Sequence, residues 1–126
     1  MVPTDLRYTN DHEWVRADGA EATIGITAYA ASQLGDIVFV ELPDVGRLLE
    51  QSSPFGVVES VKAVSDLFAP VGGEVVQANA ALGQRPELVN GDPYDAGWMI
   101  RVRLTDPGQL DDLLDAVAYD ALIAAG

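Results

Sequence analysis

Lys62 has the most informative chemistry in this chain, because it is the only lysine among 126 residues and the other six basic residues are arginines. Lysine is normally one of the commonest amino acids. Its primary amine can be acylated to form an amide, whereas the delocalised guanidinium of arginine is a poor nucleophile. The chain uses arginine wherever positive charge alone is needed, so the retained lysine is a candidate attachment point for a covalent group.

The segments on either side of Lys62 predict a β-hairpin over about residues 55–68. Residues 55–59 and 64–68 have the composition of strands, and residues 60–63 would connect them. Lys62 would then lie at the tip of a turn and point into water, where a rigid sheet holds its base while a long acylated side chain swings. We expect valines to anchor the strands beneath the tip: Val57, Val61 or Val64.

Composition limits the class of protein. The chain is 48% hydrophobic and long enough for one domain with a real core. Its net charge of −13 disfavours nucleic acid and membrane surfaces as partners and favours basic patches on other proteins. Without cysteine, no disulfide, thiolate nucleophile or Cys-ligated metal is expected. No apolar run has the length of a membrane span and the first residues lack a signal-peptide core, so we expect a soluble, cytoplasmic protein.

Short strands dominate the rest of the chain, and we expect them over residues 13–15, 22–26, 37–41 and 98–104. In the last strand the arginines should face one way and the apolar residues the other. Thr27 would cap a helix that stops at Gly35. Residues 79–97 are expected to form a loop, with Trp98 in the core after it. Many short strands with helices at the edges predict a mainly β fold, a small barrel or sandwich.

The C-terminal region has a helical period. Asp106, Pro107 and Gln109 have the form of a helix start: an acid at the N-cap, proline at the first helical position, and glutamine three residues after the cap. The apolar residues that follow form a stripe over one or two helices: Leu110, Leu113, Leu114, Val117, Leu122 and Ile123. We expect a helical segment over about residues 107–125, within a single domain spanning residues 1–126.

Five ordered motifs cover nearly the whole chain and resemble one family. The first is the hairpin, where Glu59-Ser60-Val61-Lys62-Ala63 is followed by Ser65-Asp66 and Ala69-Pro70. The others are His12-Glu13-Trp14-Val15, Gly25-Ile26-Thr27, the run from Leu34 to Pro43, and the run from Pro93 to Met99. Together they are similar to the glycine cleavage system H proteins, with the hairpin resembling the family's lipoylation site. The resemblance implies a lipoyl/biotinyl-type hybrid of barrel and sandwich with short helices and a C-terminal helical extension.

The implied function is that of a lipoyl carrier, with lipoate joined to Lys62 through an amide. The carrier would move an aminomethyl group from a pyridoxal-phosphate glycine decarboxylase to a tetrahydrofolate-dependent aminomethyltransferase. A dihydrolipoamide dehydrogenase and a lipoate-attaching enzyme complete the implied partners. The chain would not be an enzyme itself, since it supplies positioning while cofactors carry the chemistry; no catalytic or metal-binding residue is expected.

The resemblance also implies roles for three acids. Glu59, and with less support from the motif Asp66, would help the lipoate-attaching enzyme to recognise the hairpin by electrostatic complementarity. Glu13 would be an exposed carboxylate that lines a cleft and holds the cationic nitrogen of the loaded arm. The neighbouring His12 is expected to be a structural hydrogen-bonding residue. At Gln33 some family members have a histidine, and glutamine cannot titrate near neutrality.

Four alternatives stay open. A biotinyl carrier also uses a hairpin lysine but typically has methionine on both sides of it, where this chain has Val61 and Ala63. The lipoyl domains of 2-oxoacid dehydrogenases typically have aspartate before the lysine and a long linker. A hydrolase with paired carboxylates would need an acid pair, and none stands out in so acidic a chain. A lipoate donor or scaffold for other lipoyl enzymes would have the same sequence features as the carrier.

Overall fold

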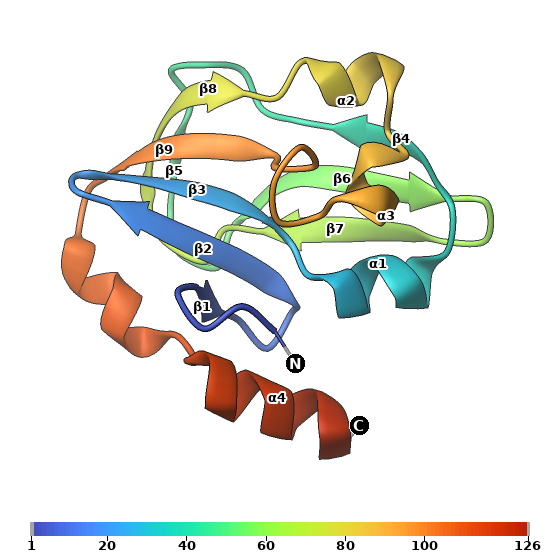
Figure 1. The fold of residues 1–126 in the computed structure, drawn as a ribbon. Helices are drawn as coiled ribbons and strands as arrows, with labels where there is room; N and C mark the ends of the chain where they lie inside the picture. The colour runs from blue at the N-terminus through green and yellow to red at the C-terminus, as the bar shows by residue number, and fades with distance from the viewer. Residues whose placement is uncertain (1, 126) are drawn as a thin grey trace.

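Two antiparallel sheets form the body of the protein (Figure 1). The structure is a computed structural model that describes residues 2–125. The larger sheet has the strand order β1 (Arg7–Tyr8), β2 (Glu13–Asp18), β3 (Glu21–Ile26), β9 (Ile100–Leu104), β8 (Gly73–Ala78) and β5 (Leu48–Leu49). The smaller sheet has the order β4 (Ile37–Glu41), β6 (Pro54–Ser60) and β7 (Val64–Phe68). The β6–β7 hairpin therefore forms where the sequence predicts it.

Short helices lie at the edges of the sheets: α1 (Ala28–Leu34), α2 (Ala81–Gln84), α3 (Leu88–Gly91), a 3-10 helix (Pro107–Asp112) and α4 (Ala116–Ala125). Thr27 caps α1 as predicted, accepting a hydrogen bond from the backbone of Ala30. In Figure 1 the segment that joins α1 to β4 passes beside the tip of the β6–β7 hairpin. No helix within residues 2–125 is long and apolar enough to cross a membrane.

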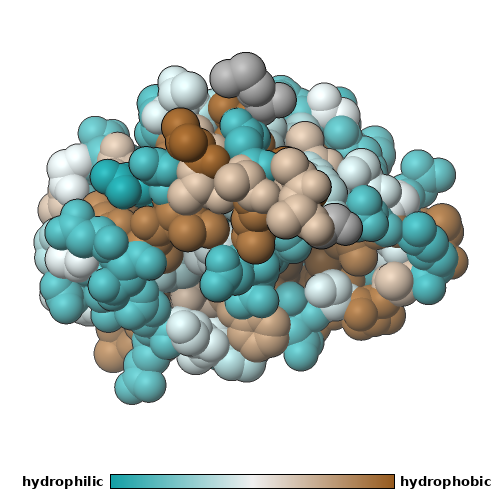
Figure 2. Space-filling model, turned by 90° about the horizontal axis from the view of Figure 1, so that it is seen from below, coloured by the Kyte–Doolittle hydropathy of each residue, from teal (hydrophilic) through white to brown (hydrophobic). Residues whose placement is uncertain are grey.

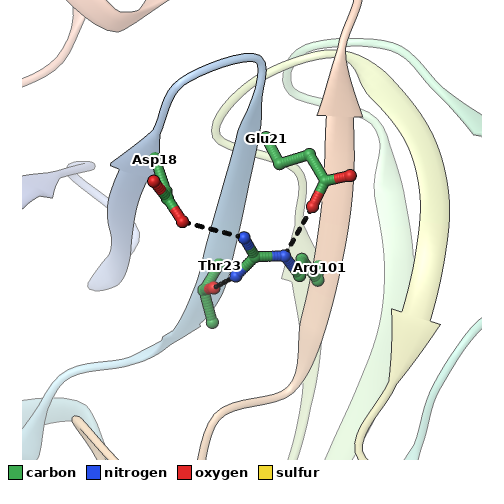
Figure 3. Close-up of polar contacts among 4 residues, drawn as sticks. All are labelled: Asp18, Glu21, Thr23 and Arg101. Atoms are coloured by element: carbon green, nitrogen blue, oxygen red, sulfur yellow. Dashed lines mark hydrogen bonds and ion pairs between the residues drawn. The ribbon is translucent and has the colours of Figure 1, made fainter.

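The main core lies between the two sheets, because alternate strand residues point inward. In β9 the side chains of Ile100, Val102 and Leu104 are buried, whereas Arg101 and Arg103 face the other way, as the sequence predicts. On the outer face, Arg101 joins the strands around it (Figure 3). Its guanidinium donates hydrogen bonds to Glu21 at 2.7 Å, Asp18 at 3.1 Å and Thr23 at 3.0 Å.

A second apolar cluster joins the C-terminal helix to the larger sheet. Tyr119 of α4 stacks on Tyr8 of β1 with ring centroids 4.7 Å apart, and both rings pack near Trp14. Figure 2 shows the side of the molecule on which α4 and β1 lie, where apolar side chains gather between hydrophilic ones. The predicted C-terminal stripe is wrong at Val117, which is 78% exposed; Tyr119, outside the stripe, is the buried anchor of the helix.

Two local predictions differ from the structure. Residues 79–97 contain α2 and α3, each four residues long and too short to show a helical period. Trp98 is only partly buried and packs against the second cluster. Asp106 does cap the 3-10 helix, accepting from the backbone N–H of Gly108 at 3.0 Å. Gln109 does not complete a capping box, because its side-chain oxygen accepts a hydrogen bond from the backbone of Gly72 at 2.7 Å.

Candidate functional site

Lys62 lies exposed at the tip of the β6–β7 hairpin, as predicted. The last paired residues of the hairpin are Glu59 and Val64. Ser60 closes the turn: its backbone N–H donates to the carbonyl of Ala63 at 2.8 Å, and its hydroxyl oxygen accepts from the backbone of Lys62 at 3.3 Å and of Ala63 at 3.0 Å. Serine at this position replaces missing ladder hydrogen bonds with side-chain ones, so the turn presents the lysine in a fixed frame.

The anchors of the hairpin differ from those predicted, since of the three valines only Val57 is even half-buried, and it lies on the face away from the core. Val61 is 70% exposed and Val64 is 65% exposed, so neither holds the strands to the core. The buried residues beneath the tip are Val58 and Leu67, which point inward from β6 and β7. The prediction failed because the alternation of residues in a strand sequence shows which side chains share a face. It does not show which of the two faces is buried when both carry apolar residues.

On the outer face of the smaller sheet, acidic and apolar side chains alternate from one strand to the next. One row across the three strands pairs Phe39 with Glu59 and Glu59 with Val64. The next row pairs Glu41 with Val57 and Val57 with Asp66. Among residues 2–125, none of these three carboxylates forms an ion pair with a basic residue. The structure thus brings Glu59 and Asp66 together on one face beside the lysine tip.

Glu13 is buried, so the prediction that it is exposed is wrong. Its side chain is 2% exposed at the start of β2. Its two carboxyl oxygens are 2.6 Å from the hydroxyl of Thr9 and 3.3 Å from the backbone N–H of Phe68, which donates to it. Burial raises the pKa of Glu13 to about 7, against the opposing effect of these hydrogen bonds. The carboxyl group is therefore partly protonated near neutral pH.

Glu13 contributes to the wall of an open pocket of about 360 Å³. Strands β1, β2 and β7 and the segment before α4 meet there, and the wall includes Thr9, Asp11, Glu13, Phe68, Asp112 and Leu114. Three of the lining residues are acids, and within the part of the chain that the structure describes none is basic. Such a pocket suits a small cation with an apolar stem.

The two remaining residues singled out in the sequence have clear positions. Nδ1 of His12 lies 2.8 Å from the hydroxyl of Tyr119, which confirms a hydrogen-bonding role. Burial lowers the pKa of His12, which favours the neutral ring that this contact can use as an acceptor. Gln33 is exposed on α1.

The sequence analysis missed residues that support the site through hydrogen bonds between distant parts of the chain. Asn90 of α3 forms hydrogen bonds with Gly35 and Ile37, which are more than fifty residues earlier in the chain. The contact of Phe68 with Glu13 likewise joins residues far apart in the chain. Ser60 and Thr9 act on residues within four positions of themselves, and both are residue types typical of turns.

A rigid two-sheet fold that displays one lysine at a hairpin tip has the architecture of a covalent carrier. The comparisons with known proteins are specific. A model of the family described as glycine cleavage H-protein matches residues 6–125. A glycine cleavage system H protein of Symbiobacterium thermophilum is 55% identical over 125 residues, covering 99% of this chain and 98% of that protein. One of Phenylobacterium zucineum is 60% identical over 119 residues, covering 94% of this chain and 98% of that protein.

The fold is also that of a solved relative. The crystal structure of a glycine cleavage system H protein from Mycobacterium marinum matches with a TM-score of 0.90 and 42% identity, covering 98% of this chain and 99% of that chain. The chain therefore belongs to the glycine cleavage H-protein family. This confirms the fold class and the role of lipoyl carrier in glycine cleavage that the motifs imply, with lipoate as the family's cofactor.

Proposed function

We propose that Lys62 is the residue to which lipoate is attached. The observation that carries the proposal is that the only lysine of the chain is exposed at the tip of a hydrogen-bonded hairpin. Acylation would convert its ammonium into a neutral amide, so the site must leave the lysine free of an essential ion pair. Lys62 has no ion-pair partner among the described residues, which supports this use.

The carrier passes an aminomethyl group between two enzymes in this proposal. It receives the group from the pyridoxal-phosphate glycine decarboxylase and delivers it to the tetrahydrofolate-dependent aminomethyltransferase, and dihydrolipoamide dehydrogenase completes the cycle. The lipoyl group, once attached, supplies the redox-active disulfide for this transfer. The protein itself is a non-catalytic carrier, and its residues bind, orient and shield. A single carrier domain over residues 1–126 in the cytoplasm remains part of the proposal.

Glu59 and Asp66 are proposed to guide the lipoate-attaching enzyme to the hairpin. Both acids share the outer face that leads to Lys62, and the exposed side chains of Phe39 and Val64 lie on either side of Glu59 and add apolar contact area. Unpaired carboxylates around exposed apolar side chains suit a partner surface with basic residues and an apolar centre. The same face is available to the shuttle enzymes.

The acidic pocket is proposed to hold the loaded arm. Phe68, in its wall, lies on the same face of β7 as Val64 and Asp66, so the arm can follow one strand face from the tip to the pocket. A cationic nitrogen near Glu13 would favour the ionised carboxylate. The buried position of Glu13 suits this role, because an ion pair is stronger away from water.

Intact-mass measurement and peptide mapping test the attachment site. Protein purified from its native host should carry one lipoyl group, on the peptide that contains Lys62. A biotinyl mass at that peptide, or a lipoyl group elsewhere, would replace the proposal. A lipoate donor for other lipoyl enzymes is distinguished by glycine–bicarbonate exchange with the decarboxylase, which only the glycine carrier supports.

A further inference from the structure

We propose that Asn90 is a positioning residue that sets how Lys62 is presented to the lipoate-attaching enzyme, by fixing the loop against which the hairpin tip rests. This role rests on the proposed attachment of lipoate to Lys62. It concerns a residue outside the hairpin, on α3, that does not line the pocket described above and whose side-chain hydrogen bonds go to Gly35 and Ile37 rather than to the lysine.

The Asn90 carboxamide holds the loop between α1 and β4 from two sides. Its oxygen accepts a hydrogen bond from the backbone N–H of Ile37 at 2.9 Å, and its nitrogen donates to the carbonyl of Gly35 at 2.9 Å. The two bonded groups flank Asp36. A carboxamide supplies a donor and an acceptor at once, which neither an aliphatic side chain nor a carboxylate of the same shape can do.

The loop in turn holds the tip of the hairpin. The carbonyl of Asp36 accepts a hydrogen bond from the backbone N–H of Val61 at 3.0 Å. Among the hydrogen bonds of the described residues, this is the one that joins turn residues 61–63 to another part of the chain. The lysine stem also lies over the loop: a Cβ atom built on Gly35 would be 3.6 Å from Cε of Lys62.

Gly35 fits this arrangement for a conformational reason. Its φ of +83° lies in the region that L side chains rarely adopt, and it ends α1 there. The chain can then turn sharply enough for the carbonyl of Asp36 to point toward the hairpin. The carbonyl of Gly35 and the N–H of Ile37 point toward Asn90 instead. The hydrogen bonds of Ser60 fix the shape of the turn. The hydrogen bonds of Asn90, together with the pairing of Ile37 with Ser60 in the β4–β6 ladder, fix its tilt relative to the body.

Tilt matters because attachment needs an accurate approach. Nζ of Lys62, after losing a proton, attacks the carbonyl carbon of an acyl adenylate formed from lipoate and ATP. The new C–N bond forms as the C–O bond to AMP breaks. A misplacement of about 1 Å at such a centre can cost about a hundredfold in rate. Loosening the loop should therefore impair attachment without unfolding the protein.

The test compares Asn90→Ala with wild type, using an ATP-dependent lipoate ligase and free lipoate. We expect kcat/KM for the carrier to fall about tenfold to a hundredfold. Hydrogen exchange at the Val61 amide should become faster, because its acceptor is no longer held. Acetylation of Lys62 by acetic anhydride should be unchanged, since the amine stays exposed. Asn90→Asp keeps the acceptor for Ile37 and the shape of the side chain, and serves as a second variant if alanine prevents folding.

Asn79→Ala is the matched control. Asn79 is a buried asparagine that also bridges backbone groups, donating to the carbonyls of Ala96 and Trp98 and accepting from the backbone of Ala81. It should destabilise the fold yet leave kcat/KM within about twofold of wild type. Wild-type kcat/KM and unchanged Val61 exchange in the Asn90 variants would overturn the role of Asn90 alone, as would an equal loss in Asn79→Ala. A wild-type chain that takes up no lipoate at Lys62 would overturn the proposed function and this role with it.

Discussion

The backbone N–H of Phe68 donates a hydrogen bond to the carboxyl group of Glu13 at 3.3 Å. Phe68 ends β7, the strand that follows Lys62, and Glu13 begins β2 in the other sheet. The buried carboxyl group is thus bonded directly to the hairpin that carries the lysine. Ionisation of Glu13 would therefore change a hydrogen bond at the base of the hairpin, where β7 joins the body of the protein.

Glu13 should make the protein less stable as the pH rises. In the unfolded chain this carboxyl ionises near pH 4.5, and in the folded protein near pH 7. Between these values the folded state binds more protons, so the free energy of unfolding falls with increasing pH. Below pH 4.5 Glu13 adds no pH dependence to this free energy, and above pH 7 the loss levels off. Denaturant titrations across the window should show a loss of about 3 kcal/mol at most from this group.

Glu13→Gln provides the control for that pH dependence. Glutamine has the same shape, and its one carbonyl oxygen can keep one of the two hydrogen bonds that Glu13 accepts, but it does not titrate. The difference in unfolding free energy between wild type and variant should therefore decline from pH 4.5 to 7. A difference that stays flat would mean that Glu13 ionises normally.

The same variant tests the pocket. Loaded with the decarboxylase and then freed of it, Glu13→Gln should release ammonia faster than wild type, because the neutral side chain holds the cationic nitrogen less well. Lipoylation should be unchanged, since Glu13 lies away from the tip. The variant Glu13→Ala should in addition have a lower free energy of unfolding than wild type, because it removes two hydrogen bonds and leaves a cavity. Equal ammonia release by wild type and Glu13→Gln would remove the carboxylate charge from the mechanism.

Lys62→Arg should abolish lipoylation while the fold persists. Arginine keeps the charge, but its guanidinium does not form the amide. The free energy of unfolding should change by no more than about 0.5 kcal/mol, as for other exposed positions. Peptide mapping after incubation with ligase, ATP and lipoate gives the readout, and a lipoyl group on this variant would contradict the assignment.

Glu59→Gln should slow attachment of lipoate, chiefly through a higher KM, and Asp66→Asn should act in the same direction. The deficit should shrink as salt is added, because screening weakens the attraction in wild type as well. Asp111→Asn makes the same change in net charge on the exposed 3-10 helix and is the control. If all three variants slow the ligase equally, net charge rather than the outer face would be responsible.

Tyr119→Phe should destabilise the docking of α4 by about 1–3 kcal/mol. The tyrosine hydroxyl lies 2.8 Å from both Nδ1 of His12 and the side-chain oxygen of Thr27, and its loss leaves both without this partner. Tyr29→Phe is the control, since Tyr29 packs against His12 through its ring. Denaturant unfolding measures the loss of stability. Faster proteolysis of the C-terminal helix in Tyr119→Phe, but not in Tyr29→Phe, would show that the loss lies in the docking of α4.

The sequence predicts what depends on local pattern. The lysine hairpin, the Thr27 cap and the alternation in β9 follow from neighbours a few residues apart, and each is present. Burial of Glu13 could not be predicted, because it is set by β7 and the C-terminal segment closing over β2. Periodicity alone picked Val117 over Tyr119 because a helix only ten residues long, buried on a narrow stripe, gives a weak pattern.

The hairpin is fixed by hydrogen bonds near its tip, through Asp36, and at its base, through Glu13. Its backbone therefore adds little to the reach of the arm, which comes from the lysine stem and the group joined to it. From Val64 to Phe68 is about 13 Å at the usual rise of a strand. For cargo on so short a tether, entry into the pocket is intramolecular, with a local concentration in the millimolar range or above. The pocket can then bind free amines weakly and still be filled by the tethered one.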